Sequence, residues 1–263
     1  MALPDGIYRV EMVNSQPVVL IPGLLCTGEL FREQIRALDG EVVQVADVVR
    51  DDSIAGMAER LLATAPPRFV LCGLSMGGYV ALETARRSPE RVAGLVLVAT
   101  SARPDTPEQT ATRHRLVALA RQKGIAAVAD ALSPRLLGPV ARRNREFLDR
   151  VTQMAETVGV EAFARQQKAI IERSDQRPVL SRLTIPTAVL VGTADEIIPM
   201  ECSQEMASAI PDARLRTIEG AGHLLSMEAP EIVTAALRAS SGAESLPDDP
   251  RRQDGQFDAG PNM

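Results

Sequence analysis

Tryptophan is absent from the 263-residue sequence, and histidine occurs twice, as His114 and His223. Aromatic residues make up 3% of the chain, so stacking platforms for bases and aromatic cages for cations are hard to build. Two histidines also argue against a metal site with several histidine ligands. Any mechanism that needs a histidine base therefore has only these two candidates.

Cysteine usage and charge favour a cytoplasmic protein. Cys26, Cys72 and Cys202 are far apart and form no Cys-x-x-Cys pair, which argues against a disulfide framework or a zinc site. The net charge of -5 does not indicate a nucleic-acid-binding surface. We find neither an apolar run of about 18 residues nor a signal-peptide pattern at the start of the chain, so no membrane span is predicted.

Short apolar segments alternate with helical patterns over the first hundred residues. Ser53 is a good N-cap for one of these helices, and Pro66-Pro67 ends it. We expect strands at 8–13, 17–21, 41–47, 69–74 and 94–100, and helices at 30–38, 54–65 and 76–88. This alternation predicts an α/β fold with a mostly parallel sheet and helices on both faces.

After residue 100 the strand pattern stops, and only helical patterns follow until about residue 173. We expect helices around 116–120, 125–132, 147–154 and 163–171, then strands at 187–192 and 213–218 with helices at 203–210 and 230–237. We interpret the helical block as a cap inserted into the α/β domain. The predicted organisation is a core of residues 1–100 and 183–240, a helical cap of 101–182 and a disordered tail of 241–263.

A serine lies between an apolar strand and an apolar helix, in Gly73-Leu74-Ser75-Met76-Gly77. Gly-x-Ser-x-Gly in that context is typical of the nucleophile elbow, a strained turn that exposes a serine at the tip of a strand. Gly73 and Gly77 are expected there because a Cβ would collide with the neighbouring strand and helix. The pattern predicts Ser75 as a nucleophile.

An activated serine needs a base, and the base needs an orienting acid. Sites on open α/β sheets lie beyond the carboxyl ends of strands. Asp195 follows the strand at 187–192 and His223 follows the strand at 213–218, so both are predicted at the same sheet edge as Ser75. Glu196 and Asp105 are rival acids, and His114, between two arginines, is the rival base.

Attack on a carbonyl produces an oxyanion, which needs two N–H donors already in position. The backbone N–H of Met76, directly after the nucleophile, is the first candidate. The second is expected in the loop that follows the first buried strand, where we assign the N–H of Leu24.

Taken together, these motifs resemble the α/β-hydrolase superfamily in its capped, esterase-like branch. The elbow Gly73-Leu74-Ser75-Met76-Gly77-Gly78 is similar to that branch's elbow, Asp195-Glu196-Ile197-Ile198-Pro199 to its acid loop, and Gly220-Ala221-Gly222-His223 to its histidine loop. The resemblance covers about residues 17–237. It departs at Pro22-Gly23, where many members have His-Gly.

The resemblance implies a serine hydrolase that cleaves a small carboxylic ester or related acyl compound through an acyl-enzyme, with no metal or organic cofactor. Ser75 would attack, His223 would move the proton and Asp195 would orient His223. Three alternatives remain: a lactonase, a carbon–carbon bond hydrolase of a catabolic pathway, and a non-catalytic ligand receptor. The implied partner is a small molecule rather than nucleic acid, and the oligomeric state stays open.

Apolar residues beside these motifs, with two from the cap, are candidates for the wall of a substrate pocket. They are Leu25, Ile197, Ile198, Leu224, Met154 and Phe163. Core packing is an equally good explanation for most of them. A short- or medium-chain acyl group fits an apolar wall, and a lactone fits it nearly as well.

Overall fold

The computed structural model describes residues 16–241. The strand expected at 8–13 and the tail expected after residue 241 lie outside the described residues. Within them, no helix combines the length and the apolar character needed to cross a membrane.

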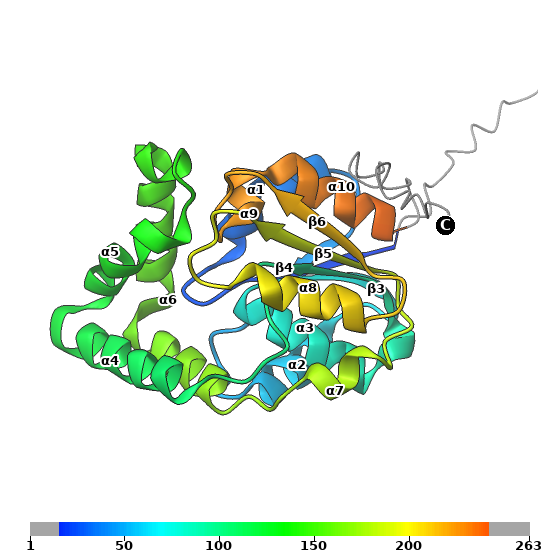
Figure 1. Ribbon diagram of the computed structural model, residues 1–263, viewed down its shortest axis with the longest axis horizontal. Coiled ribbons are helices and arrows are strands. Elements are labelled where there is room, and N and C mark those ends of the chain that lie inside the picture. Colours follow the sequence, from blue (N-terminus) through cyan, green and yellow to red (C-terminus); the bar gives the residue numbers. More distant parts are fainter. Residues whose placement is uncertain (1–15, 242–263) are drawn as a thin grey trace, which may run out of the picture.

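Six strands form one sheet, in the order β2-β1-β3-β4-β5-β6 (Figure 1). Every neighbouring pair is parallel, as the alternation of strands and helices predicts. The strands are β1 Val18–Ile21, β2 Val43–Val45, β3 Phe69–Leu74, β4 Val92–Val98, β5 Thr187–Gly192 and β6 Arg214–Ile218. Because all six run the same way, their carboxyl ends share one edge of the sheet, and the loops that follow them meet there.

Helices cover both faces of the sheet. Helices α2 (Ile54–Thr64), α3 (Met76–Arg87), α7 (Arg177–Leu180) and α8 (Met200–Ala209) contribute to the core on one face. The other face is covered by α1 (Arg32–Ala37), α9 (Leu225–Glu228) and α10 (Pro230–Ser240). Short 3₁₀ helices lie at Gly28–Phe31, Pro89–Arg91 and Ala141–Arg143.

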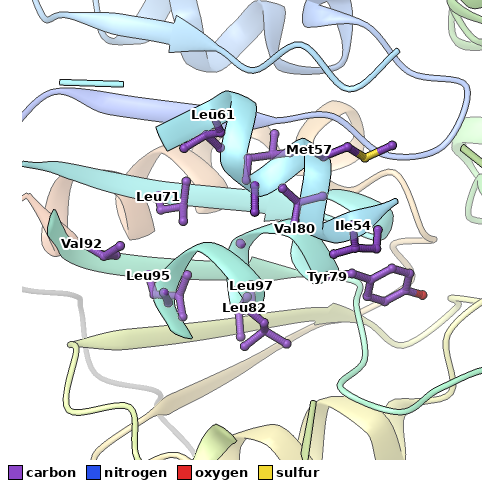
Figure 2. Close-up of a cluster of buried hydrophobic side chains, with 14 of the residues drawn as sticks. Ile54, Met57, Leu61, Leu71, Tyr79, Val80, Leu82, Val92, Leu95 and Leu97 are labelled. Atoms are coloured by element: carbon purple, nitrogen blue, oxygen red, sulfur yellow. The ribbon is translucent and has the colours of Figure 1, made fainter. Parts of the chain in front are cut away.

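The four inner strands β1, β3, β4 and β5 are almost wholly apolar because both of their faces are buried, whereas the edge strands β2 and β6 are more exposed and carry polar residues. In β1, Val19 and Ile21 point into one core, whereas Val18 and Leu20 point into the other. Figure 2 shows the first core, where α2 and α3 pack on β3 and β4. The expected N-cap of α2 is confirmed, since the Ser53 hydroxyl accepts the N–H of Gly56 at 3.1 Å.

Three long helices are inserted between β4 and β5: α4 (Pro107–Lys123), α5 (Ile125–Leu136) and α6 (Arg145–Ile171). Figure 1 shows this insertion beside the sheet rather than on either of its faces. The two helices expected at 147–154 and 163–171 belong to α6, which is interrupted at Gly159 with a φ of 73°. The insertion has its own apolar core, and its role as a cap remains a prediction.

Candidate active site

A cavity of about 540 Å³ lies between the carboxyl edge of the sheet and the insertion. Its wall includes residues from the loops after β1, β3, β4, β5 and β6, together with side chains of α4, α5 and α6. The volume is in the range of small-molecule sites. The loops at the strand ends therefore meet at a partly open cavity.

Ser75 lies on the wall of this cavity, between β3 and α3. Its φ of 55° and ψ of -115° are strained for a residue with a side chain. The surrounding backbone holds this conformation: the Ser75 N–H donates to the Val98 carbonyl at 2.9 Å, and the Ser75 carbonyl accepts from the Gly78 N–H at 2.8 Å and the Thr100 hydroxyl at 2.7 Å. The serine is thus fixed at the tip of its strand.

The two flanking glycines make this turn possible, as expected from the sequence. A Cβ on Gly73 would lie 2.2 Å from the carbonyl oxygen of Gly77, and a Cβ on Gly77 would lie 2.1 Å from that of Ile21. Neither distance is compatible with a side chain, and both neighbours are backbone atoms, which yield least. The close contact brings α3 directly against the end of β1.

His223 shares the cavity wall with Ser75, and its Nδ1 lies 2.8 Å from Asp195 Oδ2. Their side chains are only 3% and 1% exposed. Asp195 Oδ1 accepts the N–H groups of Ile197 at 2.8 Å and Ile198 at 3.0 Å, which fixes the carboxylate. A hydrogen bond from Nδ1–H to this carboxylate leaves Nε2 to accept a proton.

The rival residues take no part in the hydrogen bond between Asp195 and His223. Glu196 is exposed and pairs with Arg142 at 3.0 Å, and His114 is exposed on α4. Asp105 lies on the cavity wall but binds two arginines instead of His223. Of the three acids considered from the sequence, Asp195 is therefore the one in contact with the cavity histidine.

The assignment of the Met76 and Leu24 N–H groups as oxyanion donors stays a prediction. Met76 is the first residue of α3, and Leu24 lies on the cavity wall. Among residues 16–241, neither N–H donates to another group of the protein. The next amide, that of Leu25, is occupied, since it donates to Gln166 Oε1 of α6 at 3.2 Å. A positive φ of 59° at Leu25 shapes this turn.

Five of the six expected pocket residues lie on the cavity wall: Leu25, Ile197, Ile198, Leu224 and Met154. The expectation for Phe163 is wrong. Phe163 is fully buried in the insertion's own core, where its neighbours include Val128 of α5. An apolar stripe on a helix can pack against a neighbouring helix or line a cavity. Here the neighbouring helices cover it.

Apart from Asp105, which was considered only as a rival acid, sequence reasoning missed Arg173 and the charged and polar residues that follow β4. Arg103, Asp105, Thr106, Glu108, Gln109, Thr112, Arg113 and Arg173 all line the cavity. The segment from 103 to 113 directly follows β4, so the strand-end rule that led to Asp195 and His223 could have identified most of it. Arg173, at the far end of the insertion, gives no such signal.

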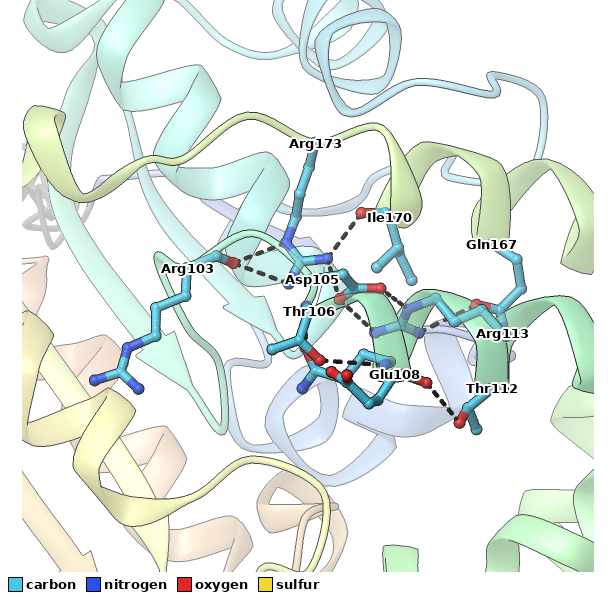
Figure 3. A network of polar contacts seen from close by, with 10 residues as sticks. Arg103, Asp105, Thr106, Glu108, Thr112, Arg113, Gln167, Ile170 and Arg173 are labelled. Carbon is cyan, nitrogen blue, oxygen red and sulfur yellow. Dashed lines mark hydrogen bonds and ion pairs between the residues drawn. The ribbon is translucent and has the colours of Figure 1, made fainter.

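Asp105 is the centre of this polar cluster (Figure 3). It accepts hydrogen bonds from Arg113 Nε at 2.5 Å and from Arg173 Nη1 at 2.7 Å, and its side chain is 2% exposed. Burial alone would raise the pKa of Asp105, but hydrogen bonds and charge from the two guanidinium groups hold it below its ordinary value. Since Asp105 precedes α4 and Arg173 follows α6, the cluster joins the two ends of the insertion.

The insertion also holds the histidine loop. The carbonyl oxygen of Leu136, at the end of α5, accepts the N–H groups of His223 at 3.0 Å and Leu224 at 3.2 Å. Glu228 Oε2 accepts the N–H of Gly138 at 2.9 Å and that of Gly222 at 3.0 Å. Burial raises the pKa of the Glu228 carboxyl. Three hydrogen bonds thus link the end of α5 and Gly138 to the segment that carries His223, and the fourth, from Gly222 to Glu228, lies within that segment.

Two cysteines, Cys26 and Cys202, also lie on the wall. Burial raises the pKa of the Cys26 thiol to about 12, so the reactive thiolate is not formed at neutral pH. Among the residues that the structure describes, no three histidine, cysteine or acidic side chains gather closely enough to hold a metal ion.

Comparisons with known proteins agree on the family. A profile of the "Alpha/beta hydrolase family" matches residues 18–236. The pimeloyl-[acyl-carrier protein] methyl ester esterase of Aromatoleum aromaticum is 28% identical over 213 residues, which are 69% of this chain and 77% of the relative.

Two solved structures are similar throughout the fold. A thermophilic esterase from Thermogutta terrifontis is 34% identical with a TM-score of 0.77, covering 86% of this chain and 89% of its own. The enol-lactonase from Burkholderia xenovorans LB400 is 25% identical with a TM-score of 0.78, covering 86% and 91%.

The Glu228→Ala substitution should weaken both the fold and the histidine loop. It leaves the buried N–H groups of Gly138 and Gly222 without an acceptor, so the free energy of unfolding should fall by about 2 kcal/mol. Urea unfolding measures this loss. Glu231→Ala, at an exposed position on α10, is the control and should change stability by less than about 0.5 kcal/mol. Equal effects of the two substitutions would contradict the role assigned to Glu228.

The Asp105→Asn substitution should destabilise the protein in a pH-dependent way. Removing the carboxylate leaves two guanidinium groups with no anion between them, at a cost of about 3 kcal/mol at pH 7. The pKa of Asp105 in the folded protein lies below its ordinary 3.8, so the ionised carboxylate stabilises the fold above about pH 4. This stabilisation is lost as the pH falls through the folded-state pKa.

The test is urea unfolding of the wild-type protein and of Asp105→Asn over a series of pH values. The difference between their free energies of unfolding should become smaller as the pH falls. A difference that stays constant, or that widens as the pH falls, would show that Asp105 is not held in its ionised form by these arginines.

Proposed function

The chain belongs to the alpha/beta hydrolase family, and we propose that it is a serine hydrolase that cleaves a small carboxylic ester or a related acyl compound through an acyl-enzyme. One observation carries the proposal. The strained Ser75 and the Asp195-bound His223 lie on the wall of the same cavity. A serine, a histidine and an orienting carboxylate in that arrangement are the groups that acyl transfer requires.

In the proposed first step, Ser75 Oγ attacks the carbonyl carbon of the substrate while His223 Nε2 takes the hydroxyl proton. The resulting oxyanion is stabilised by the N–H groups of Met76 and Leu24. His223 then gives its proton to the leaving alcohol, and the carbonyl re-forms as the acyl-enzyme. Water attacks this intermediate by the same path, which releases the acid and restores Ser75. Asp195 orients the imidazole and stabilises its charged form.

The apolar part of the wall supports a small acyl substrate. Leu25, Ile197, Ile198, Leu224 and Met154 would surround the acyl chain. A lactone is the second candidate substrate, because an enol-lactonase is among the structures with the same fold at 25% identity. The mechanism needs no metal or organic cofactor. The cytoplasm is the proposed compartment, since all three cysteines are free and buried.

We expect the purified protein to release p-nitrophenol from esters between acetate and octanoate. A serine-directed fluorophosphonate should block this activity and attach to Ser75, and Ser75→Ala should abolish both turnover and labelling. Mass spectrometry of the labelled peptide identifies the site. Absence of turnover across the series together with an unlabelled Ser75 would refute the hydrolase and favour a ligand receptor. A panel of thioesters, lactones and carbon–carbon hydrolase substrates then ranks the remaining alternatives.

The two histidines provide a matched test of the base. His223→Ala should lower kcat by about a thousandfold or more, because the proton of Ser75 then has no acceptor. His114→Ala removes an exposed side chain on α4 and should leave kcat within about twofold. Steady-state kinetics with one ester measures both. The opposite ranking would overturn the assignment of His223.

A further inference from the structure

The cavity wall is rich in positive charge, although the chain as a whole has a net charge of -5. Arginines outnumber acidic residues there: the wall includes Arg103, Arg113, Arg135 and Arg173 against Asp105 and Glu108. Positive charge gathered in a cavity raises the local concentration of anions, because the surrounding protein screens it less than water does.

The arginines are not equally neutralised. Arg103 has a carboxylate partner, Glu205 Oε2, at 2.8 Å. Arg113 and Arg173 share the single carboxylate of Asp105 (Figure 3), so within residues 16–241 one of these two positive charges has no carboxylate of its own. An arrangement of two guanidinium groups around one carboxylate favours the approach of a second carboxylate.

Arg113 is the member of the cluster that is free to take such a ligand. Its Nε and Nη2 donate to Asp105, and its Nη1 donates to Gln167 Oε1 at 3.1 Å. Each Nη carries a second N–H, and these two have no acceptor among the residues that the structure describes. The Arg113 side chain is 20% exposed, whereas Arg173 is 4% exposed and also donates to the carbonyls of Arg103 and Ile170.

Helix α3 connects the cluster to the candidate nucleophile. Tyr79, which also lines the cavity, is one helical turn beyond Ser75. The Arg173 guanidinium lies over the Tyr79 ring, 4.2 Å from its centre. A substrate that reacts at Ser75 and binds the arginines therefore spans the part of the cavity beside Tyr79 between its two functional groups.

We propose that the cavity binds acyl substrates that carry a free carboxylate, with Arg113 as the residue that recognises it. Thr112 and Gln109, from the same face of the wall, would supply the neighbouring polar contacts. The inference rests on the proposed serine hydrolase for its chemistry. It adds that an ester with an ionised carboxylate at the far end of its chain is the preferred substrate class.

The test compares monomethyl succinate, glutarate and adipate with the uncharged methyl butanoate, pentanoate and hexanoate. The wild-type protein should prefer at least one monomethyl dicarboxylate over its uncharged counterpart in kcat/KM. In Arg113→Gln this preference should fall by about tenfold to a hundredfold, which is the usual effect of one charge-assisted hydrogen bond. Arg113→Lys, which keeps the charge but not the fork of donors, should retain part of the preference.

Arg121→Gln is the matched control, because Arg121 is exposed on the same helix and makes no contact with the cavity. It should leave the preference unchanged. An equal loss for charged and uncharged esters in Arg113→Gln would mean that Arg113 acts only through the structure, and the inference would be overturned. A wild-type protein that cleaves the uncharged esters with no preference for the charged ones would overturn it as well.

Binding of adipate to the Ser75→Ala protein separates this inference from the proposed function. Isothermal titration calorimetry should detect adipate but not hexanamide, and Arg113→Gln in the same background should lose the signal. Adipate binding without any ester turnover would support the inference and refute the hydrolase. Ester turnover without adipate binding would support the hydrolase and overturn the inference.

Discussion

The close approach of three backbone segments at Ser75 is the constraint on which the rest of the site depends. Gly77 lets the start of α3 contact the end of β1, and Gly73 lets β3 pass beneath the same helix. The loop after β1 is drawn in by the same contact, since a Cβ on Gly23 would lie 3.5 Å from Ser75 Cβ. One packing arrangement therefore exposes the serine, directs the first amides of the helix towards it and brings the Leu24 turn beside it.

The insertion fixes the loops at the strand ends through contacts of its own. The turn after β1 is bonded to α6 through Leu25 and Gln166, and the histidine loop is bonded to the end of α5 through Leu136. The cluster at Asp105 closes the insertion at its base. Apart from the pairing of Arg113 with Asp105, these contacts join residues far apart in the sequence, so the geometry of the cavity is a property of the assembled fold.

Much of the fold and of the candidate site follows from local patterns. The apolar strands and their terminating loops predict the parallel sheet, and the strand-end rule places Ser75, Asp195 and His223 at one edge. The short helices α7 and α9 have too few residues to produce a periodic signal.

The misplaced Phe163 and the overlooked Arg173 have a different cause. An apolar stripe shows which face of a helix is buried but not which neighbour covers it. The pairing of Arg173 with Asp105 spans 68 positions and leaves no mark in either local sequence. Residues that follow strands were therefore predictable, whereas the insertion was predicted correctly at Met154 and wrongly at Phe163.

The hydrogen bonds from Leu136 to the histidine loop have a consequence for how this protein can diverge. The end of α5, which lines the cavity, also carries the carbonyl that fixes the backbone of His223. Replacing the insertion with that of a relative would therefore move the His223 loop as well as change the cavity wall. The side chains that face the cavity without touching that carbonyl are the positions at which the wall can change while the loop stays in place.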